Sequence, residues 1–230
     1  LLLTGASAGD DGMLEKIKNH LIQGGDVFAT PGFMYRLQEQ DLVDEFTGLR
    51  VTAGKITDNR FGSFEVGWSN EVDYVEADRP ITFPIIDWKT NDCEFLAIIA
   101  REQMPTPVLA FSYYGKGRFF VLNLPDVWSD TYALPAQLLT LLRKKTSSHL
   151  PAYVEGKAKI VVFPYDNNSM VLQSFLEHGS KVRVHVKGEV DAIQNITDGE
   201  SIRVLYKKDG ESVFELAIPP LTQTVIRWHK

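Results

Sequence analysis

Few residues in this chain have the type and spacing that chemistry requires. The single cysteine, Cys93, excludes both an internal disulfide and a metal site built from cysteines. The histidines are scattered and lack the His-x-x-x-His or His-Glu spacing of metal ligands. They are His20, His149, His178, His185 and His229. We therefore expect no metal and no cofactor, and we identify no catalytic residue.

Two groups of neighbouring carboxylates remain, Asp10-Asp11 and Asp41 with Asp44-Glu45. A retaining glycosidase needs two carboxyl groups about 5 Å apart, one as acid/base and one as nucleophile. The simpler interpretation is that these acids lie at helix N-termini and on a solvated helix face. The sequence favours that interpretation.

Composition limits the class of protein. Of the 230 residues, 44% are hydrophobic and 23% are charged, which is typical of a globular chain. The net charge of −6, without a Lys/Arg-rich block, makes nucleic acid an unsuitable partner. No apolar run approaches about 18 residues, so we expect a soluble chain without a membrane span. The compartment is not indicated.

The first part of the chain, residues 1–148, mixes helical and strand patterns. Apolar runs at 1–4 and 26–30 flank a segment in which Leu14, Ile17 and Leu21 recur at helical spacing. This order predicts a parallel strand–helix–strand unit in a mostly parallel sheet. Because Leu1 already lies in an apolar run, we expect this α/β domain to be truncated at its N-terminus, within a longer protein.

From residue 39 onward, the secondary-structure patterns of the first part vary in strength. A short helix is predicted near 39–46, and residues 48–92 show no sustained period, which predicts loops and short strands. Strands at 107–113 and 118–124 around Gly115-Lys116-Gly117 predict a hairpin. A last helix begins at Ser129 or Asp130.

A polar segment at 144–151 predicts a linker, and the pattern changes after it. Residues 152–230 contain six short strand patterns separated by turns, and no helical pattern. The first part carries 20 Asp/Glu against 14 Lys/Arg, whereas the second is balanced. We therefore predict two domains, an α/β domain at 1–148 and a small antiparallel β-sandwich at 152–230.

Three segments, in this order, carry a resemblance to a known family. They are Gly24-Gly25-Asp26-Val27-Phe28-Ala29-Thr30 with the later run 41–51, the hairpin 106–122, and the sandwich segments 159–163, 191–193 and 217–221. The chain resembles the trimerisation domain and C-terminal β-sandwich of microbial β-galactosidases. That resemblance implies a class I glutamine amidotransferase-like (flavodoxin-like) fold for the first domain, and a catalytic barrel upstream of this chain.

The same resemblance implies where amidotransferase chemistry would lie, and the residues there do not suit it. The family places its nucleophilic cysteine at the turn after the 26–30 strand, where this chain has Thr30-Pro31-Gly32. Its histidine would follow the 118–124 strand, where Pro125-Asp126 stands. A thiol nucleophile needs a neighbouring base, so we expect this domain to lack a nucleophile.

A ligand crevice is the remaining candidate site. Ligands favour the carboxyl ends of strands in open α/β sheets. The residues expected there are Ser7, Phe33, Tyr35, Asp126 and Trp128. An exposed tryptophan at such a crevice would suit a carbohydrate or another small molecule.

Aromatic residues also gather in the weakly patterned region. They are Phe61, Phe64, Trp68 and Tyr74. A long aromatic segment of this kind is typically functional or buried against a partner, so these side chains pack either on another subunit or upstream domain, or inside this domain.

Two functions from different classes follow. The first is a non-catalytic accessory or oligomerisation region of a glycoside-hydrolase-like protein, whose partners are the upstream domain and further copies of itself. The second is a carbohydrate- or small-molecule-binding module that uses the crevice near Trp128. A hydrolase whose site is contained in this chain is a weaker third interpretation.

Overall fold

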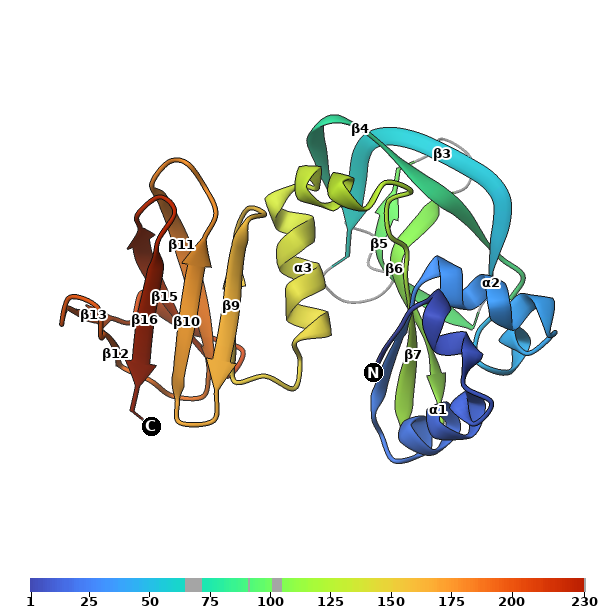
Figure 1. Cartoon of the computed structure of the whole chain (residues 1–230), viewed down its shortest axis with the longest axis horizontal. Helices are drawn as coiled ribbons and strands as arrows, with labels where there is room; N and C mark the ends of the chain where they lie inside the picture. Colours follow the sequence, from blue (N-terminus) through green and yellow to red (C-terminus); the bar gives the residue numbers. More distant parts are fainter. Residues whose placement is uncertain (65–71, 91, 101–104, 230) are drawn as a thin grey trace. The chain divides into compact units, whose positions relative to one another are not determined.

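The computed structural model describes residues 1–64, 72–90, 92–100 and 105–229 (Figure 1). The chain separates into two compact units, Leu1–Ala133 and Leu134–Lys230. This boundary lies earlier than the polar segment at 144–151, and the helix α3 (Ala136–Thr146) belongs to the second unit. The fold class is therefore an α/β unit followed by a β-rich unit.

A seven-stranded sheet with the order β1-β2-β7-β6-β5-β3-β4 forms the first unit. Its strands are β1 (Leu2–Leu3), β2 (Asp26–Ala29), β3 (Leu49–Ser63), β4 (Asp73–Trp88), β5 (Cys93–Ile99), β6 (Thr106–Tyr114) and β7 (Gly117–Leu122). Its helices are α1 (Met13–Ile22) and α2 (Pro31–Glu39), with the 3₁₀ segments η1 (Gly5–Gly9), η2 (Val43–Glu45) and η3 (Trp128–Ala133).

The sheet is mixed. Strands β1, β2 and β7 run parallel, and α1 provides the expected crossover from β1 to β2. The pairs from β7 through β6, β5 and β3 to β4 are all antiparallel. The prediction of a mostly parallel sheet is therefore wrong. Between α2 and β7 the described residues contain no further crossover helix, and the strands there pair with antiparallel neighbours.

The weakly patterned region is the largest difference from the prediction. Instead of loops and short strands, it forms the two longest strands, β3 and β4, which pair with each other. The pairing register shifts between Val51 and Lys55 and again between Asp58 and Arg60. Each irregularity breaks the period-2 alternation, because it moves later side chains to the other face. A long bent hairpin therefore carries no uniform sequence period.

Two of the three predicted helices are displaced. The helix expected near 39–46 instead begins at Pro31, and only the short η2 lies within 43–45. Proline is favoured in the first turn because its missing N–H has no partner there anyway. The last helix begins at Ala136, after Pro135, while η3 occupies 128–133.

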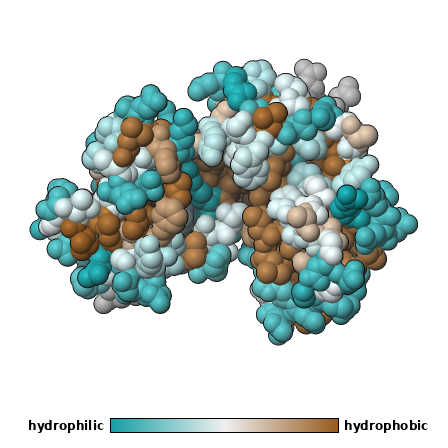
Figure 2. Space-filling view, viewed as in Figure 1, coloured by the Kyte–Doolittle hydropathy of each residue, from teal (hydrophilic) through white to brown (hydrophobic). Residues whose placement is uncertain are grey.

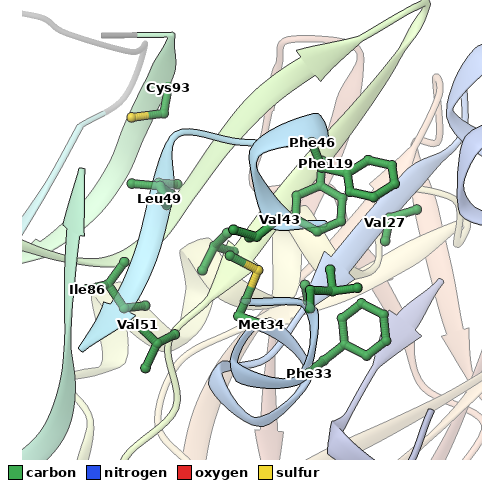
Figure 3. Close-up of a cluster of buried hydrophobic side chains, with 14 of the residues drawn as sticks. Val27, Phe33, Met34, Val43, Phe46, Leu49, Val51, Ile86, Cys93 and Phe119 are labelled. Atoms are coloured by element: carbon green, nitrogen blue, oxygen red, sulfur yellow. The ribbon is translucent and has the colours of Figure 1, made fainter. Parts of the chain in front are cut away.

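A single apolar cluster packs α1 and α2 against the sheet. Figure 3 shows Phe33 and Met34 of α2 beside Val27 of β2 and Phe119 of β7. Phe61 and Phe64 are also buried inside the first unit, Phe61 edge-on to Phe83. The exposed Tyr74 lies under the Arg60 guanidinium, 4.3 Å from it, and Trp68 lies outside the described residues. Phe61 and Phe64 therefore pack inside this domain, which is one of the two interpretations given for these aromatics.

The second unit is a β-sandwich with α3 at its start. One sheet has the order β13-β12-β16-β10-β9 and the other β14-β15-β11-β8, and all pairs are antiparallel. The strands are β8 (Ala152–Glu155), β9 (Ile160–Tyr165), β10 (Ser169–Ser174), β11 (Ser180–Lys187), β12 (Ala192–Asn195), β13 (Ser201–Arg203), β14 (Tyr206–Lys208), β15 (Glu211–Ile218) and β16 (Gln223–Trp228).

The predicted antiparallel sandwich is confirmed, although β8 and β12 were not predicted and the 201–207 strand divides into β13 and β14. Buried residues from both sheets share one core, with Trp228 at 1% exposure. Alternate residues of edge strand β9 remain exposed, namely Val161, Phe163 and Tyr165. Hydrophobic side chains thus also appear on the surface of this unit (Figure 2).

Candidate functional site

The parallel strands place the ends of three segments at one edge of the first sheet. Strand β1 leads into η1, β2 leads into α2, and β7 leads into the segment 123–128. Their carboxyl ends face the same way, so this edge is where an open α/β sheet would bind a ligand.

Backbone contact closes part of this edge. A Cβ added to Gly5 would lie 3.5 Å from the carbonyl group of Gly32, so η1 and α2 touch through their backbones. Thr30 at the end of β2 donates its hydroxyl to Leu3 O at 3.1 Å and is buried. The space between the ends of β1 and β2 is thereby filled by the chain itself.

The predicted crevice residues divide into different environments. Phe33 is fully buried in the core, so it does not line an open crevice. Ser7 accepts a hydrogen bond from the Thr4 N–H at 3.2 Å, and Tyr35 is half exposed. Asp126 pairs with Lys55 of β3 at 2.8 Å, and Trp128 is 65% exposed. Among the described residues, no hydrogen bond or ion pair joins Ser7 or Tyr35 to Asp126 or Trp128.

The segment after β7 is instead fastened to the β3–β4 hairpin. Asp126 donates its N–H to Thr82 O at 2.8 Å. The Asn123 side chain donates to Pro84 O at 3.0 Å, and Asp130 pairs with Arg79 at 2.7 Å. Trp128 and Tyr132 stay exposed on η3 beside these ion pairs. This patch, composed of Lys55, Arg79, Asp126, Trp128, Asp130 and Tyr132, is called the η3 patch below.

The turn after β2 does not have the strained backbone conformation of a nucleophile elbow. Thr30 is the residue before α2, with an ordinary extended conformation (φ −86°). The non-glycine residues with positive φ in the described chain lie elsewhere, and they are Asp41, Lys159, Asn168, Asp209 and Leu221. A strained nucleophile elbow is therefore absent from this turn as it is described.

Cys93 is unsuited to nucleophilic chemistry. It lies at the start of β5, 7% exposed, at the rim of the cluster in Figure 3. Burial, with a smaller contribution from Asp92, raises the pKa of its thiol to about 11. The thiolate is the reactive form, so Cys93 is protonated and inert near neutral pH.

Three of the neighbouring carboxylates, Asp10, Asp44 and Glu45, are each paired with a different cation. Asp10 pairs with Lys16 at 2.5 Å, and that hydrogen bond, helped by the Gly12 N–H, lowers the pKa of Asp10. Asp44 pairs with Arg50, and Glu45 pairs with Lys18. These acids therefore act as local charges on the surface of the first unit.

A polar cluster that the sequence did not reveal lies in the second unit, on the sheet of β8, β11 and β15. Both ring nitrogens of His185 face carboxylates, Nε2 to Glu155 at 3.1 Å and Nδ1 to Glu211 at 3.0 Å. Tyr153 stacks on the His185 ring with centroids 4.6 Å apart and donates its hydroxyl to Glu211 at 2.9 Å. Arg183 completes the cluster through Glu155.

Burial, then the hydrogen bond to Glu211, raises the pKa of Tyr153 above its ordinary value. The period-2 pattern of residues 181–186 indicated only that His185 lies on the outer face of its strand. The cross-strand partners Tyr153 and Glu211 are 32 and 26 residues away, so only the pairing register brings them together. Within the described residues, no group of three His, Cys, Asp or Glu side chains is arranged to hold a metal ion.

The fold and these sites define a class: an α/β unit joined to an antiparallel β-sandwich, without a recognisable catalytic constellation in the described residues. Residues 151–226 match the family model of the C-terminal domain of a probable glycosyl hydrolase. None of the curated proteins compared matches the chain. The helices of the described residues are all too short or too polar to cross a membrane.

Several solved structures align with nearly the whole chain. The α-L-fucosidase isoenzyme 2 from Paenibacillus thiaminolyticus aligns with 100% of this chain and 41% of its own, at 14% identity and a TM-score of 0.50. The cold-adapted β-galactosidase from Rahnella sp. R3 aligns over 99% and 31%, at 14% identity and a TM-score of 0.49. The β-galactosidase from Bacillus circulans sp. alkalophilus aligns over 99% and 32%, at 13% identity and a TM-score of 0.48. This chain thus spans less than half the length of each.

Proposed function

We propose that this chain is a non-catalytic accessory region of a glycoside-hydrolase-like protein whose catalytic domain lies upstream. The observation that carries the proposal is the match of residues 151–226 to a C-terminal domain of probable glycosyl hydrolases. The α-L-fucosidase from P. thiaminolyticus supports it, because its fold extends over the α/β unit as well and its own chain is longer. In this proposal the first unit has the amidotransferase-like fold and serves as an oligomer interface or shapes the upstream active site.

The chemistry of the described residues agrees with a non-catalytic role. Asp10 and Asp44 are held by Lys16 and Arg50, and Cys93 is protonated at neutral pH. Glycoside hydrolysis instead needs two carboxyl groups facing one bond.

Two measurements test this proposal. The 230-residue chain should not hydrolyse nitrophenyl galactosides or fucosides, and turnover that survives repurification would contradict the accessory role. The intact protein in its source should have a mass well above 25.9 kDa while yielding the peptides of this chain. A mature protein of this mass alone would also contradict the proposal.

The oligomerisation role has its own test. Light scattering of the intact protein should give a multiple of its chain mass, and a deletion of residues 1–133 should give a monomer. If the intact protein is monomeric, the first unit is not an oligomer interface. Its remaining proposed role is then to shape the upstream active site.

A second candidate function is carbohydrate binding at the η3 patch. Trp128 and Tyr132 are 65% and 58% exposed, beside the Lys55–Asp126 and Arg79–Asp130 ion pairs. An aromatic face suits the apolar face of a sugar ring, and the charged side chains offer donors and acceptors for its hydroxyl groups.

Titration calorimetry with galactose, fucose and lactose tests this function. Trp128→Ala should abolish any saturable heat of binding, whereas Tyr74→Ala, which removes an exposed aromatic outside the patch, should not. Saturable binding that survives Trp128→Ala would exclude the η3 patch.

A further inference from the structure

The second unit contains a hollow between the open edges of its two sheets. Strand β8 ends one sheet and β9 ends the other, and α3 packs on β8 beside them. The hollow has a volume of about 220 Å³. Its apolar wall is formed by Leu150, Ala152, Val154, Ile160, Val162 and Pro164.

Arg143 of α3 provides the charged group at this hollow. Its guanidinium donates to Gly156 O at 2.7 Å, to Lys157 O at 2.8 Å and to Val154 O at 3.5 Å. These carbonyls hold the side chain in place, yet no carboxylate of the described residues forms an ion pair with it. Two of its five N–H groups take no part in these three bonds.

A partly buried cation without a counter-ion is unfavourable, and burial lowers the pKa of Arg143 accordingly. An anion bound beside the Arg143 guanidinium would offset the free-energy cost of burying its charge.

The surrounding charge also favours an anion. Although the whole chain has a net charge of −6, residues 143–162 contain five basic residues and one acidic residue, a net charge of +4. The basic residues are Arg143, Lys144, Lys145, Lys157 and Lys159, and the acidic residue is Glu155. Positive charge of this kind attracts anions and offsets the partial negative charge at the C-terminus of α3.

We propose that this hollow binds a small organic carboxylate, with its charged end on Arg143 and a short aliphatic body against Leu150, Ile160 and Val162. The planar guanidinium matches a carboxylate, and the wall is too apolar for a fully hydrated anion. The volume equals about seven water molecules at roughly 30 Å³ each, which suits an acid of about four to six carbons.

The test uses the full chain and methyl resonances in NMR spectra, with butanoate as the probe. Butanoate should shift the methyl signals of Leu150, Val154, Ile160 and Val162 in a saturable manner below about 50 mM. The neutral four-carbon alcohol 1-butanol should bind about tenfold more weakly, because it lacks the charged carboxylate that pairs with Arg143. Inorganic phosphate should leave these methyl signals unchanged.

Paired variants separate binding from folding. Val162→Phe should fill the hollow and abolish the shifts, whereas Val171→Phe, on the opposite face of the neighbouring strand β10, should keep them. Arg143→Lys should weaken butanoate about tenfold without affecting 1-butanol, and Arg203→Lys should change neither. Equal affinity for butanoate and 1-butanol, unsaturable shifts, or binding that survives Val162→Phe would each overturn the proposal.

Discussion

Arg118 and Asp26 form a two-pronged ion pair across the parallel strands β7 and β2. Arg118 Nε lies 2.9 Å from Asp26 Oδ1, and Nη2 lies 2.6 Å from Oδ2. The same guanidinium lies 5.1 Å from the centre of the Phe120 ring, which in turn stacks on Phe28. The pair therefore links the start of two strands and covers the aromatic face between them.

Asp26→Asn should lower the free energy of unfolding of the first unit by about 1–3 kcal/mol, because it leaves the partly buried Arg118 without a counter-charge. Hydrogen exchange of β2 under native conditions measures the loss. Glu39→Gln is the control, since it breaks the exposed Arg36–Glu39 pair of the same unit and should cost less than about 1 kcal/mol. Equal effects of the two changes would show that Arg118 is stabilised in some other way.

Gly117 should tolerate no side chain. A Cβ there would lie 2.3 Å from Gly25 O and 2.6 Å from Leu21 O, both backbone atoms that cannot rotate away. Gly117→Ala should therefore cost about 2–4 kcal/mol of stability, measured by urea unfolding. Gly9→Ala, where a Cβ meets nothing within 4 Å, should be nearly neutral. A neutral Gly117→Ala would mean that β7 and α1 do not approach this closely.

Cys93 should react slowly with alkylating reagents. With its thiol pKa raised from 9.0 to about 11, the thiolate fraction at pH 8 falls about a hundredfold relative to an ordinary thiol. Iodoacetamide labelling of native and urea-unfolded chain, followed by mass spectrometry, measures the difference. Cys93→Ser should leave any hydrolase activity of the intact protein unchanged, and fast native labelling would indicate an accessible thiolate.

The stability of the second unit should depend on Tyr153 at high pH. Its folded-state pKa is raised above the ordinary value of 10.0, so above pH 10 the unfolded chain releases a proton that the folded chain keeps. The free energy of unfolding should then fall by up to about 1.4 kcal/mol per pH unit. Hydrogen exchange of β11 in wild type and Tyr153→Phe measures this slope. Tyr153→Phe should lose the part of this pH dependence that Tyr153 contributes. An identical slope in wild type and variant would contradict the raised pKa of Tyr153.

Local sequence patterns determined much of this protein. The Gly115–Gly117 turn fixed the β6–β7 hairpin because its strands are neighbours in the chain. Short-range periodicity also predicted the strand–helix–strand start and the presence of strands without helices in the sandwich, although most sandwich strands pair with partners distant in the chain.

Only the tertiary structure revealed the long bent β3–β4 hairpin and the residues that come together at each site. Irregular register in β3 and β4 removes the period that would have predicted them. Phe33 was predicted at a surface crevice but is buried, because a strand-to-helix turn does not show which face of the helix meets the sheet. Tyr153, His185 and Glu211 meet through strand pairing over 26 or more residues, and Arg143 meets the hollow through the packing of α3 on β8. Such contacts depend on non-local burial and register, which a local sequence pattern does not specify.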